Sequence, residues 1–300
     1  MAVVGGLGVV NIDILYSGID HLPTLGEEVF SRHFGLYLGG GMPATLVNLR
    51  RLGVDARILT FLGDDFFSQF ARREFRAAGA EVFNLYRGGQ MPVVISSTMV
   101  CDGDRAFMSY SDRVEMTDEM LQDAYEHLKD ADIVLMQPGF LPLYRALKAD
   151  GRTMIFDTGW EDDLSLEKYG EYLDLADYYL PNRREALKIT GADTPEGAAA
   201  ILAQRLERPV IKLDRDGCMY LEDGSIHTVP PLPDVQVVDA TGAGDAFFAG
   251  FAYGIAHGCA LEKCIQFGNI TGAACVQAPG CLTRYVTEAQ LWDIRRAVYG

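Results

Sequence analysis

The segment VVDATGAGDAFFAGF, residues 237–251, combines a turn of small residues with the start of an apolar helix. Gly242, Ala243 and Gly244 leave the backbone free of bulky side chains, so successive N–H groups can turn toward one point. That point lies at the N-terminus of a helix that we expect to start near Asp245, where the helix dipole favours negative charge. The segment therefore predicts an anion hole at the start of a helix.

Asp245 stands where a P-loop would carry Lys followed by Ser or Thr. A carboxylate favours a helix start for purely local reasons, because it caps the first N–H groups. Beside a bound anion, however, a carboxylate is repelled unless it has a proton to accept. We therefore interpret Asp245 as the base that takes a proton from an attacking alcohol, while the backbone amides hold the charge on a transferred γ-phosphoryl group.

The composition excludes several classes of partner. The chain has 300 residues, 49% of them hydrophobic, and a formal net charge of −16 at pH 7, so it would repel nucleic acid and anionic membrane surfaces. It contains no run of about 18 apolar residues and no basic leader followed by an apolar stretch. The six cysteines form no C-x-x-C pair, and the five histidines lack the spacing of metal ligands. We expect a cytoplasmic protein without nucleic-acid or membrane partners.

Short hydrophobic strands alternate with helical segments along most of the chain. Segments such as ARILTFLG (56–63), GRTMIFDTG (151–159) and RPVIKLD (208–214) fit the interior of a parallel sheet. This alternation predicts a three-layer α/β/α fold with a central, mostly parallel sheet. Segments 27–39 and 92–110 contain successive strands without a helix between them, which predicts a small antiparallel sheet that acts as a lid. We assign the lid to residues 13–39 and 91–111, and the α/β body to residues 1–12, 40–90 and 112–300.

At Asp239, Thr241, the 242–245 turn and the pair 249–250, the chain resembles the second signature of the ribokinase-like (phosphofructokinase B) family of carbohydrate kinases. Ala240 stands where Thr, Ser, Pro or Val is usual, and the resemblance extends over nearly the whole chain. It implies a ribokinase-like fold with a β-sheet lid. It also implies an enzyme that transfers the γ-phosphoryl group of Mg-ATP to a hydroxyl of a small carbohydrate.

Two further segments resemble the acceptor site of this family. YLGGGMPATLVNLRRLG resembles the first signature, in which the glycines matching Gly39, Gly40 and Gly41 let backbone amides approach substrate hydroxyls. The segment N-I-D matches the family's substrate pair and gives Asn11 and Asp13 as candidates for binding neighbouring hydroxyls. A polar strand end without a binding role is the alternative for this pair.

Other segments resemble the parts of the family that hold ATP and magnesium. Asn182 and Glu185 stand three residues apart at a helix start, and the resemblance implies that Glu185 organises magnesium through water. Asp214 stands at a place usually taken by glycine, where a carboxylate is unfavourable unless it points to solvent or to Arg215. The other candidates for the ATP site are Lys212, Gly217, Thr241, Asn269, Ala273 and Gly280.

Asp239 has a second predicted role, at a cation site. In potassium-activated relatives a monovalent cation lies next to the anion hole, held by groups that match Asp239, Thr241 and the loop around Gly280. Arg284 falls where such relatives carry a small polar ligand. We therefore expect the Arg284 guanidinium to replace K+ by pairing with Asp239, which makes potassium dependence doubtful.

These elements predict an ATP-dependent sugar kinase. Ala44 stands at the place of an asparagine that is usual in the family, so one group that would bind a ribose-like sugar is absent. A nucleoside kinase of the same fold is the alternative, because Phe30, Phe34, Tyr37 and Met99 leave room for a more apolar acceptor pocket.

A non-catalytic sugar-binding or scaffold homologue is a third interpretation. The intact 242–245 turn and the pair Asn182 and Glu185 argue against it. A sheet with an exposed face often pairs with its twin. We therefore expect a homodimer formed through the lid.

Overall fold

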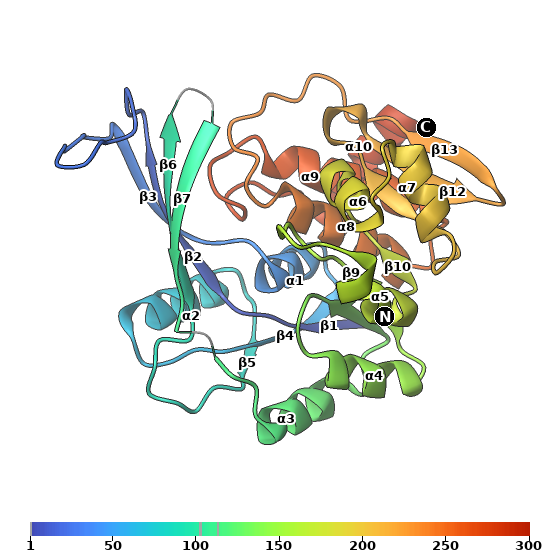
Figure 1. Cartoon of the computed structure of the whole chain (residues 1–300), viewed down its shortest axis with the longest axis horizontal. Coiled ribbons are helices and arrows are strands. Elements are labelled where there is room, and N and C mark those ends of the chain that lie inside the picture. The colour runs from blue at the N-terminus through green and yellow to red at the C-terminus, as the bar shows by residue number, and fades with distance from the viewer. Residues whose placement is uncertain (1, 102–103, 113) are drawn as a thin grey trace.

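The structure, a computed structural model, describes residues 2–101, 104–112 and 114–300. Its centre is a six-stranded sheet in the order β10-β9-β8-β1-β4-β5, in which every neighbouring pair is parallel (Figure 1). These strands are β1 Val3–Leu7, β4 Asp55–Thr60, β5 Val82–Asn84, β8 Ile133–Met136, β9 Thr153–Phe156 and β10 Tyr178–Tyr179.

Alternate residues of these strands supply two hydrophobic cores, one on each face of the sheet. In β8, Ile133 and Leu135 belong to the core that includes α1, α2, α8, α9 and α10. Val134 and Met136 belong to the core that includes α3, α4 and α5. The predicted three-layer α/β/α fold is therefore confirmed. The helices are α1 Met42–Arg51, α2 Phe66–Ala77, α3 Asp118–Leu128, α4 Leu141–Ala149, α5 Leu166–Leu175, α6 Arg183–Thr190, α7 Pro195–Leu202, α8 Ala243–Ala256, α9 Leu261–Cys275 and α10 Glu288–Tyr299.

A second sheet projects from the body and forms the lid (Figure 1). Its strands lie in the order β3-β2-β6-β7. The outer pairs are antiparallel, but the central pair β2 and β6 is parallel, so the expectation of an antiparallel lid is wrong at its centre. The chain passes through α1, β4, α2 and β5 before β6, and it re-enters the lid in the direction of β2. The strands are β2 Asn11–Ser17, β3 His33–Leu38, β6 Val94–Cys101 and β7 Asp104–Tyr110; residues 102–103 of the predicted lid lie outside the described residues.

A third sheet follows α7. Strand β11 (Val210–Lys212) was expected inside the parallel sheet, but it pairs antiparallel with β12 (Cys218–Glu222), which pairs with β13 (Ser225–Val229). One parallel bridge, between Asn182 and Lys212, joins this three-stranded sheet to the segment that follows β10. The bridge places the start of α6 beside the end of β11.

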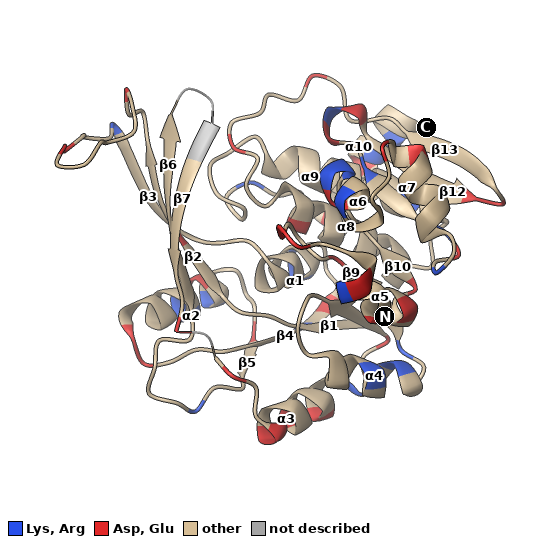
Figure 2. Ribbon diagram, viewed as in Figure 1, with Lys and Arg blue, Asp and Glu red and all other residues tan. Residues whose placement is uncertain are grey.

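Helix α8 is apolar on all sides, and residues 246–254 are buried. A helix of this kind lies inside a protein rather than on its surface. Charged side chains are instead concentrated on outer helices and loops of the body, and the lid strands carry few of them (Figure 2). Within the described part of the chain, none of the helices is long and apolar enough to cross a membrane.

Candidate active site

The start of α8 is the centre of the candidate site. Gly242 is the N-cap residue with φ +77°, and a side chain there would overlap Cβ of Cys281, so glycine is required. The N–H of Ala243 donates to a carbonyl of the preceding turn. The amides of Gly244 and Asp245 lie in the first turn, where N–H groups have no acceptor within the helix. These two amides, at the positive end of the helix dipole, can hold an anion.

The carboxylate of Asp245 faces the glycine loop that precedes α1. The backbone of Gly41 donates a hydrogen bond to it, and a Cβ at Gly40 would lie 2.5 Å from its Oδ2, so a side chain there would displace the carboxylate. Burial raises the pKa of Asp245 from its usual 3.8 to about 6; Asp157 and Asp13 add to this effect and the Gly41 hydrogen bond opposes it. Such a carboxylate is ionised at neutral pH and can accept a proton.

Asn11 and Asp13 lie on β2, where it leaves the body. Nδ2 of Asn11 donates to Oδ1 of Asp13 at 2.8 Å, and Asp13 is 8% exposed. The N–H of Gly39 donates to the carbonyl of Asn11 at 2.7 Å, so the glycine loop continues directly from β3. The structure therefore places the predicted acceptor residues close to Asp245: Asn11, Asp13, Gly39, Gly40 and Gly41.

A partly buried ion pair borders the α8 turn. Nζ of Lys212 lies 2.9 Å from Oδ2 of Asp157, and the side chains are 13% and 18% exposed. The same Nζ would lie 3.6 Å from a Cβ at Gly244. Burial alone would lower the pKa of Lys212, but the carboxylates of Asp157 and Glu185 outweigh burial and raise it. The ammonium is therefore charged at neutral pH.

Sequence reasoning missed Asp157. The residue directly follows the parallel strand β9, and its Oδ1 accepts the N–H of Gly159 at 2.9 Å. Ligands of open α/β sheets bind at the carboxyl ends of parallel strands. A carboxylate directly after the segment TMIF was therefore the signal that could have identified it.

Asn182 and Glu185 form a capping box at the start of α6. The Asn182 side chain accepts the Glu185 N–H at 3.0 Å, and Oε2 of Glu185 accepts the Asn182 N–H at 2.7 Å. This spacing therefore has a local structural role. Burial and the charge of Asp157 raise the pKa of Glu185, while Lys212 lowers it.

Asp214 and Gly217 bound the loop between β11 and β12. Asp214 is exposed, so of the two orientations left open by the sequence, solvent exposure is the one observed. Its φ is +55°, and Asp adopts this left-handed conformation more readily than most residues. The backbone therefore keeps the shape that a glycine would give at this position.

The model of the pfkB family carbohydrate kinases matches residues 9–288. The chain belongs to the PfkB family of carbohydrate kinases. This PfkB kinase is therefore a phosphotransferase with an alcohol group as acceptor.

The kinase is similar to family members that act on different sugars. It is 28% identical to the ribokinase of Arabidopsis thaliana over 306 residues, which cover 92% of this chain and 76% of that protein. It is 25% identical over 297 residues to the 2-dehydro-3-deoxygluconokinase of Bacillus subtilis (strain 168), covering 92% and 89%. The structure of Arabidopsis thaliana ribokinase complexed with ribose and ATP matches with a TM-score of 0.83 and 24% identity over 98% of both chains. The ribokinase-like fold is therefore confirmed.

The predicted adenine-binding residues of this PfkB kinase lie along α9 and in the loop after it. Asn269 and Ala273 share one face of α9, and Nδ2 of Asn269 donates to the carbonyl of Pro230 at 3.0 Å. Gly280, in the loop after α9, donates its N–H to Oδ2 of Asp239 at 3.0 Å. This hydrogen bond joins the loop after α9 to the segment before the 242–245 turn.

Asp239 also holds Thr241, which donates its N–H and its hydroxyl to Oδ1 at 2.9 and 2.7 Å. Arg284 is exposed and lines a small cavity with Asn48, Ala246 and Thr271. The pairing of Arg284 with Asp239 stays a prediction.

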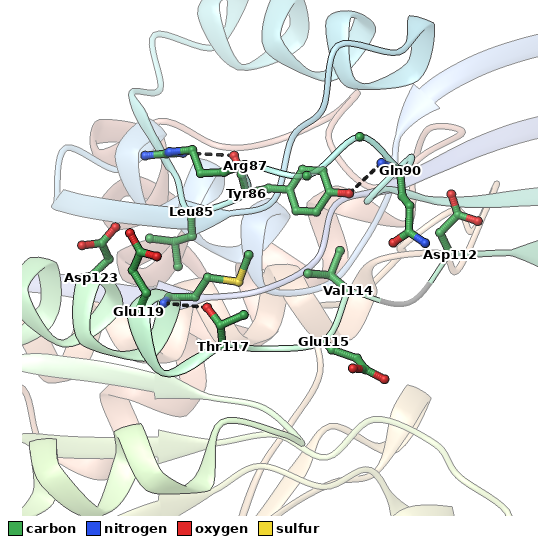
Figure 3. Close-up of a pocket in the computed structure, with 13 residues that line it drawn as sticks. Leu85, Tyr86, Arg87, Gln90, Asp112, Val114, Glu115, Thr117, Glu119 and Asp123 are labelled. Atoms are coloured by element: carbon green, nitrogen blue, oxygen red, sulfur yellow. Dashed lines mark hydrogen bonds between the residues drawn. The ribbon is translucent and has the colours of Figure 1, made fainter.

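A pocket of about 690 Å³ lies apart from this site, between the loop after β5 and the start of α3 (Figure 3). Residues 85–90, Asp112 and residues of the segment 114–123 contribute its lining, and its described lining residues include none of the predicted site residues. Arg87 donates to the backbone carbonyls of Asn84 and Tyr86 rather than into the pocket. The position of this pocket therefore does not indicate a site at Asp245.

Proposed function

We propose that this PfkB kinase transfers the γ-phosphoryl group of ATP to a hydroxyl of a small sugar, with Asp245 as the base. The position of the Asp245 carboxylate carries the proposal, because it lies between the anion-binding turn and the acceptor residues of β2. With a pKa of about 6, it takes the proton of the hydroxyl while the new O–P bond forms. The bond to the β-phosphate oxygen breaks, and ADP leaves.

Hydrogen-bond donors would stabilise the negative charge that develops on the transferred phosphoryl group. The amides of Gly244 and Asp245 point out of the first turn of α8, and the Lys212 ammonium lies beside them. Donors that are fixed before the reaction stabilise the transition state without reorganisation. Asp157 keeps the ammonium at this position.

Magnesium fits the charges around this ion pair. The two carboxylates of Glu185 and Asp157 both act on the single Lys212 ammonium, and the charge of Asp157 adds to burial in raising the pKa of Glu185. Mg2+ keeps several waters and binds through one or two carboxylates plus substrate phosphates, so Glu185 and Asp157 would hold it through water. The ion would neutralise charge on the β- and γ-phosphates.

ATP is the proposed donor because the structurally similar ribokinase is complexed with ATP. Gly217 and Thr241 would lie beside its phosphates, on the loop after β11 and before the α8 turn. Asn269, Ala273 and Gly280 would receive the adenine.

The lid register favours a sugar over a nucleoside as the acceptor. Tyr37 pairs with Asp13 and shares its face. Phe34 and Met99 both pair with the residue three positions after Asp13, so they project from the opposite face. Phe30 is exposed in the loop before β3. Of these four side chains, only Tyr37 therefore lies on the face of Asp13, so the four do not together build an apolar pocket there.

The apolar face opposite Asp13 supports association of two copies through the lid. Phe34, Met108 and Tyr110 share this face by register and are 66%, 70% and 56% exposed. Large apolar side chains exposed on one face of a sheet indicate an interaction surface. A second copy would cover it by an isologous contact.

The test is an ADP-release assay with Mg-ATP and a panel of pentoses, ketohexoses, sugar acids, sugar phosphates and nucleosides. Asp245→Asn keeps the shape of the side chain but cannot accept the proton, so kcat should fall by about 10²–10⁴ with a smaller change in KM. Asp223→Asn, the same substitution at an exposed turn, serves as the control.

A loss of only a few fold in Asp245→Asn would refute the assignment of the base. Release of ADP with a nucleoside and with none of the sugars would favour the nucleoside kinase. If no acceptor raises ADP release, calorimetry with ATP decides whether the protein binds nucleotide without catalysis.

A further inference from the structure

A row of polar side chains crosses the lid from its outer strand to Asp13. In the strand register, Asp13 of β2 lies beside Ser96 of β6, and Ser96 lies beside Ser109 of β7. Side chains at paired positions project from the same face of a sheet, and Asn11, two residues before Asp13, shares that face. Asp13 is 8% and Ser96 7% exposed, so their hydrogen bonds must be made within the protein or to a bound ligand.

Three hydrogen bonds join this row. Oγ of Ser96 lies 2.9 Å from Oγ of Ser109 and 3.1 Å from Oδ1 of Asn11, and Nδ2 of Asn11 lies 2.8 Å from Oδ1 of Asp13. The row therefore runs through β7, β6 and β2, from an exposed serine to a buried carboxylate.

The orientation of the Asn11 amide fixes the direction of every bond in the row. Nδ2 of Asn11 donates to Oδ1 of Asp13, so Asn11 presents Oδ1 to the hydroxyl of Ser96. Ser96 has one hydroxyl hydrogen and donates it to Asn11. In the bond with Ser109, Ser96 must therefore accept, and Ser109 donates.

We propose that Ser96 is a positioning residue, which orients Asn11 and Asp13 to bind two neighbouring hydroxyl groups of the acceptor. A Cβ at Gly39 would lie 2.8 Å from Oδ2 of Asp13 and 2.9 Å from Nδ2 of Asn11, so both atoms border the glycine loop that leads to Asp245. The pair thus presents a donor and an acceptor side by side. Adjacent hydroxyls of a polyol match this arrangement, because one accepts from the amide and the other donates to the carboxylate.

This inference rests on the proposed function and adds residues that the sequence did not indicate. Without the Ser96 hydroxyl, Oδ1 of Asn11 would be left without its partner inside the lid, and the amide would turn toward water. The acceptor would then bind to a mobile amide, whereas ATP would meet an unchanged site on the body. Ser109 should matter less, because Ser96 can still donate to Asn11 when Ser109 is absent.

The kinetic test compares Ser96→Ala with Ser97→Ala. Ser97 is the next residue of β6 and projects from the opposite face of the lid, so its variant controls for the loss of a serine from this strand. We expect Ser96→Ala to raise the KM for the acceptor about tenfold, with the KM for ATP and kcat changed by less than about threefold. Ser97→Ala should leave all three near wild type. An equal rise in the KM for ATP would indicate general damage to the lid and overturn the proposal.

A second measurement needs no acceptor, so failure of the row can be told from failure of the proposed function. The Asn11 side-chain amide, assigned by the loss of its NMR signal in Asn11→Asp, should exchange slowly with water in wild type and in Ser97→Ala. In Ser96→Ala it should exchange faster. If no sugar is phosphorylated but the amide exchanges as described, the proposed function is overturned and the positioning role of Ser96 is supported. If a sugar is phosphorylated but the amide exchanges at the same rate in both variants, the positioning role of Ser96 is overturned.

Discussion

The start of α8 and the lid hold their functional groups by different means. At α8, four consecutive residues, 242–245, form the turn, and the buried helix behind them fixes its direction. In the lid, the row from Ser109 to Asp13 is assembled from three strands, and one of its hydrogen bonds joins residues 85 positions apart in the chain. One site is made by local backbone geometry, the other by strand register.

This difference separates the expected effects of mutation. The α8 turn is packed against the core, so changes there should lower both kcat and stability. The lid projects from the body and carries several exposed apolar side chains, so changes there should alter acceptor binding or association and leave the chemistry intact.

The largest effect is expected at Gly242. A Cβ at this position would overlap Cys281, and φ is +77°. We expect Gly242→Ala to lower the free energy of unfolding by about 3 kcal/mol and kcat by about a hundredfold or more, because the anion-binding amides shift. Urea unfolding and steady-state kinetics measure the two effects.

Gly258→Ala is the matched control for Gly242→Ala. Gly258 also has a positive φ, +63°, but a Cβ there would meet nothing within 4 Å. Its variant should lose about 1 kcal/mol and keep its activity. Equal losses of stability in the two variants would mean that backbone strain, and not the contact with Cys281, explains the requirement for glycine.

A smaller effect is expected from Asp157→Asn. Removal of the carboxylate leaves the partly buried Lys212 ammonium without its ion-pair partner, so kcat/KM for ATP should fall by about 10- to 100-fold. Asp174→Asn breaks an ion pair with Arg205 whose side chains are 56% and 36% exposed, and it should change kcat/KM little. A wild-type value in Asp157→Asn would remove Lys212 and Asp157 from the proposed phosphate site.

The sequence was most informative where a predicted site is formed by residues that are adjacent in the chain. The helix start, the glycine turn and Asp245 lie in one segment, and the alternation of strands and helices sufficed for the three-layer fold. The partners Asp157 and Lys212 are 55 residues apart, and no local pattern joins them. For the same reason, the sequence indicated neither the proposed role of Ser96 nor the parallel pairing at the centre of the lid. It also grouped Phe34 with Tyr37, although the register places them on opposite faces.

The pH dependence of kcat/KM tests the environment of Asp245 in the free enzyme. Burial raises the pKa of this carboxylate to about 6, and only the ionised form accepts the proton. The value of kcat/KM should therefore be constant above about pH 7 and fall about tenfold per pH unit below pH 6. The charge of Asp157 contributes to the raised pKa, so Asp157→Asn should move the acid limb to lower pH. A limb near pH 4 in wild type would show that Asp245 is solvated in the free enzyme.

The smallest effect on chemistry is expected from Phe34→Asp. Phe34 lies on the lid face opposite Asp13 and is 66% exposed, while Phe66 of α2, 69% exposed, offers the same substitution on the body. Light scattering should give a dimer for wild type and Phe66→Asp and a monomer for Phe34→Asp, because a buried charge at the lid interface is costly. The same mass for both variants would contradict association through the lid. If Phe34→Asp also raised the KM for the acceptor as Ser96→Ala does, the two faces of the lid would be coupled, because association would then order the row that holds Asp13.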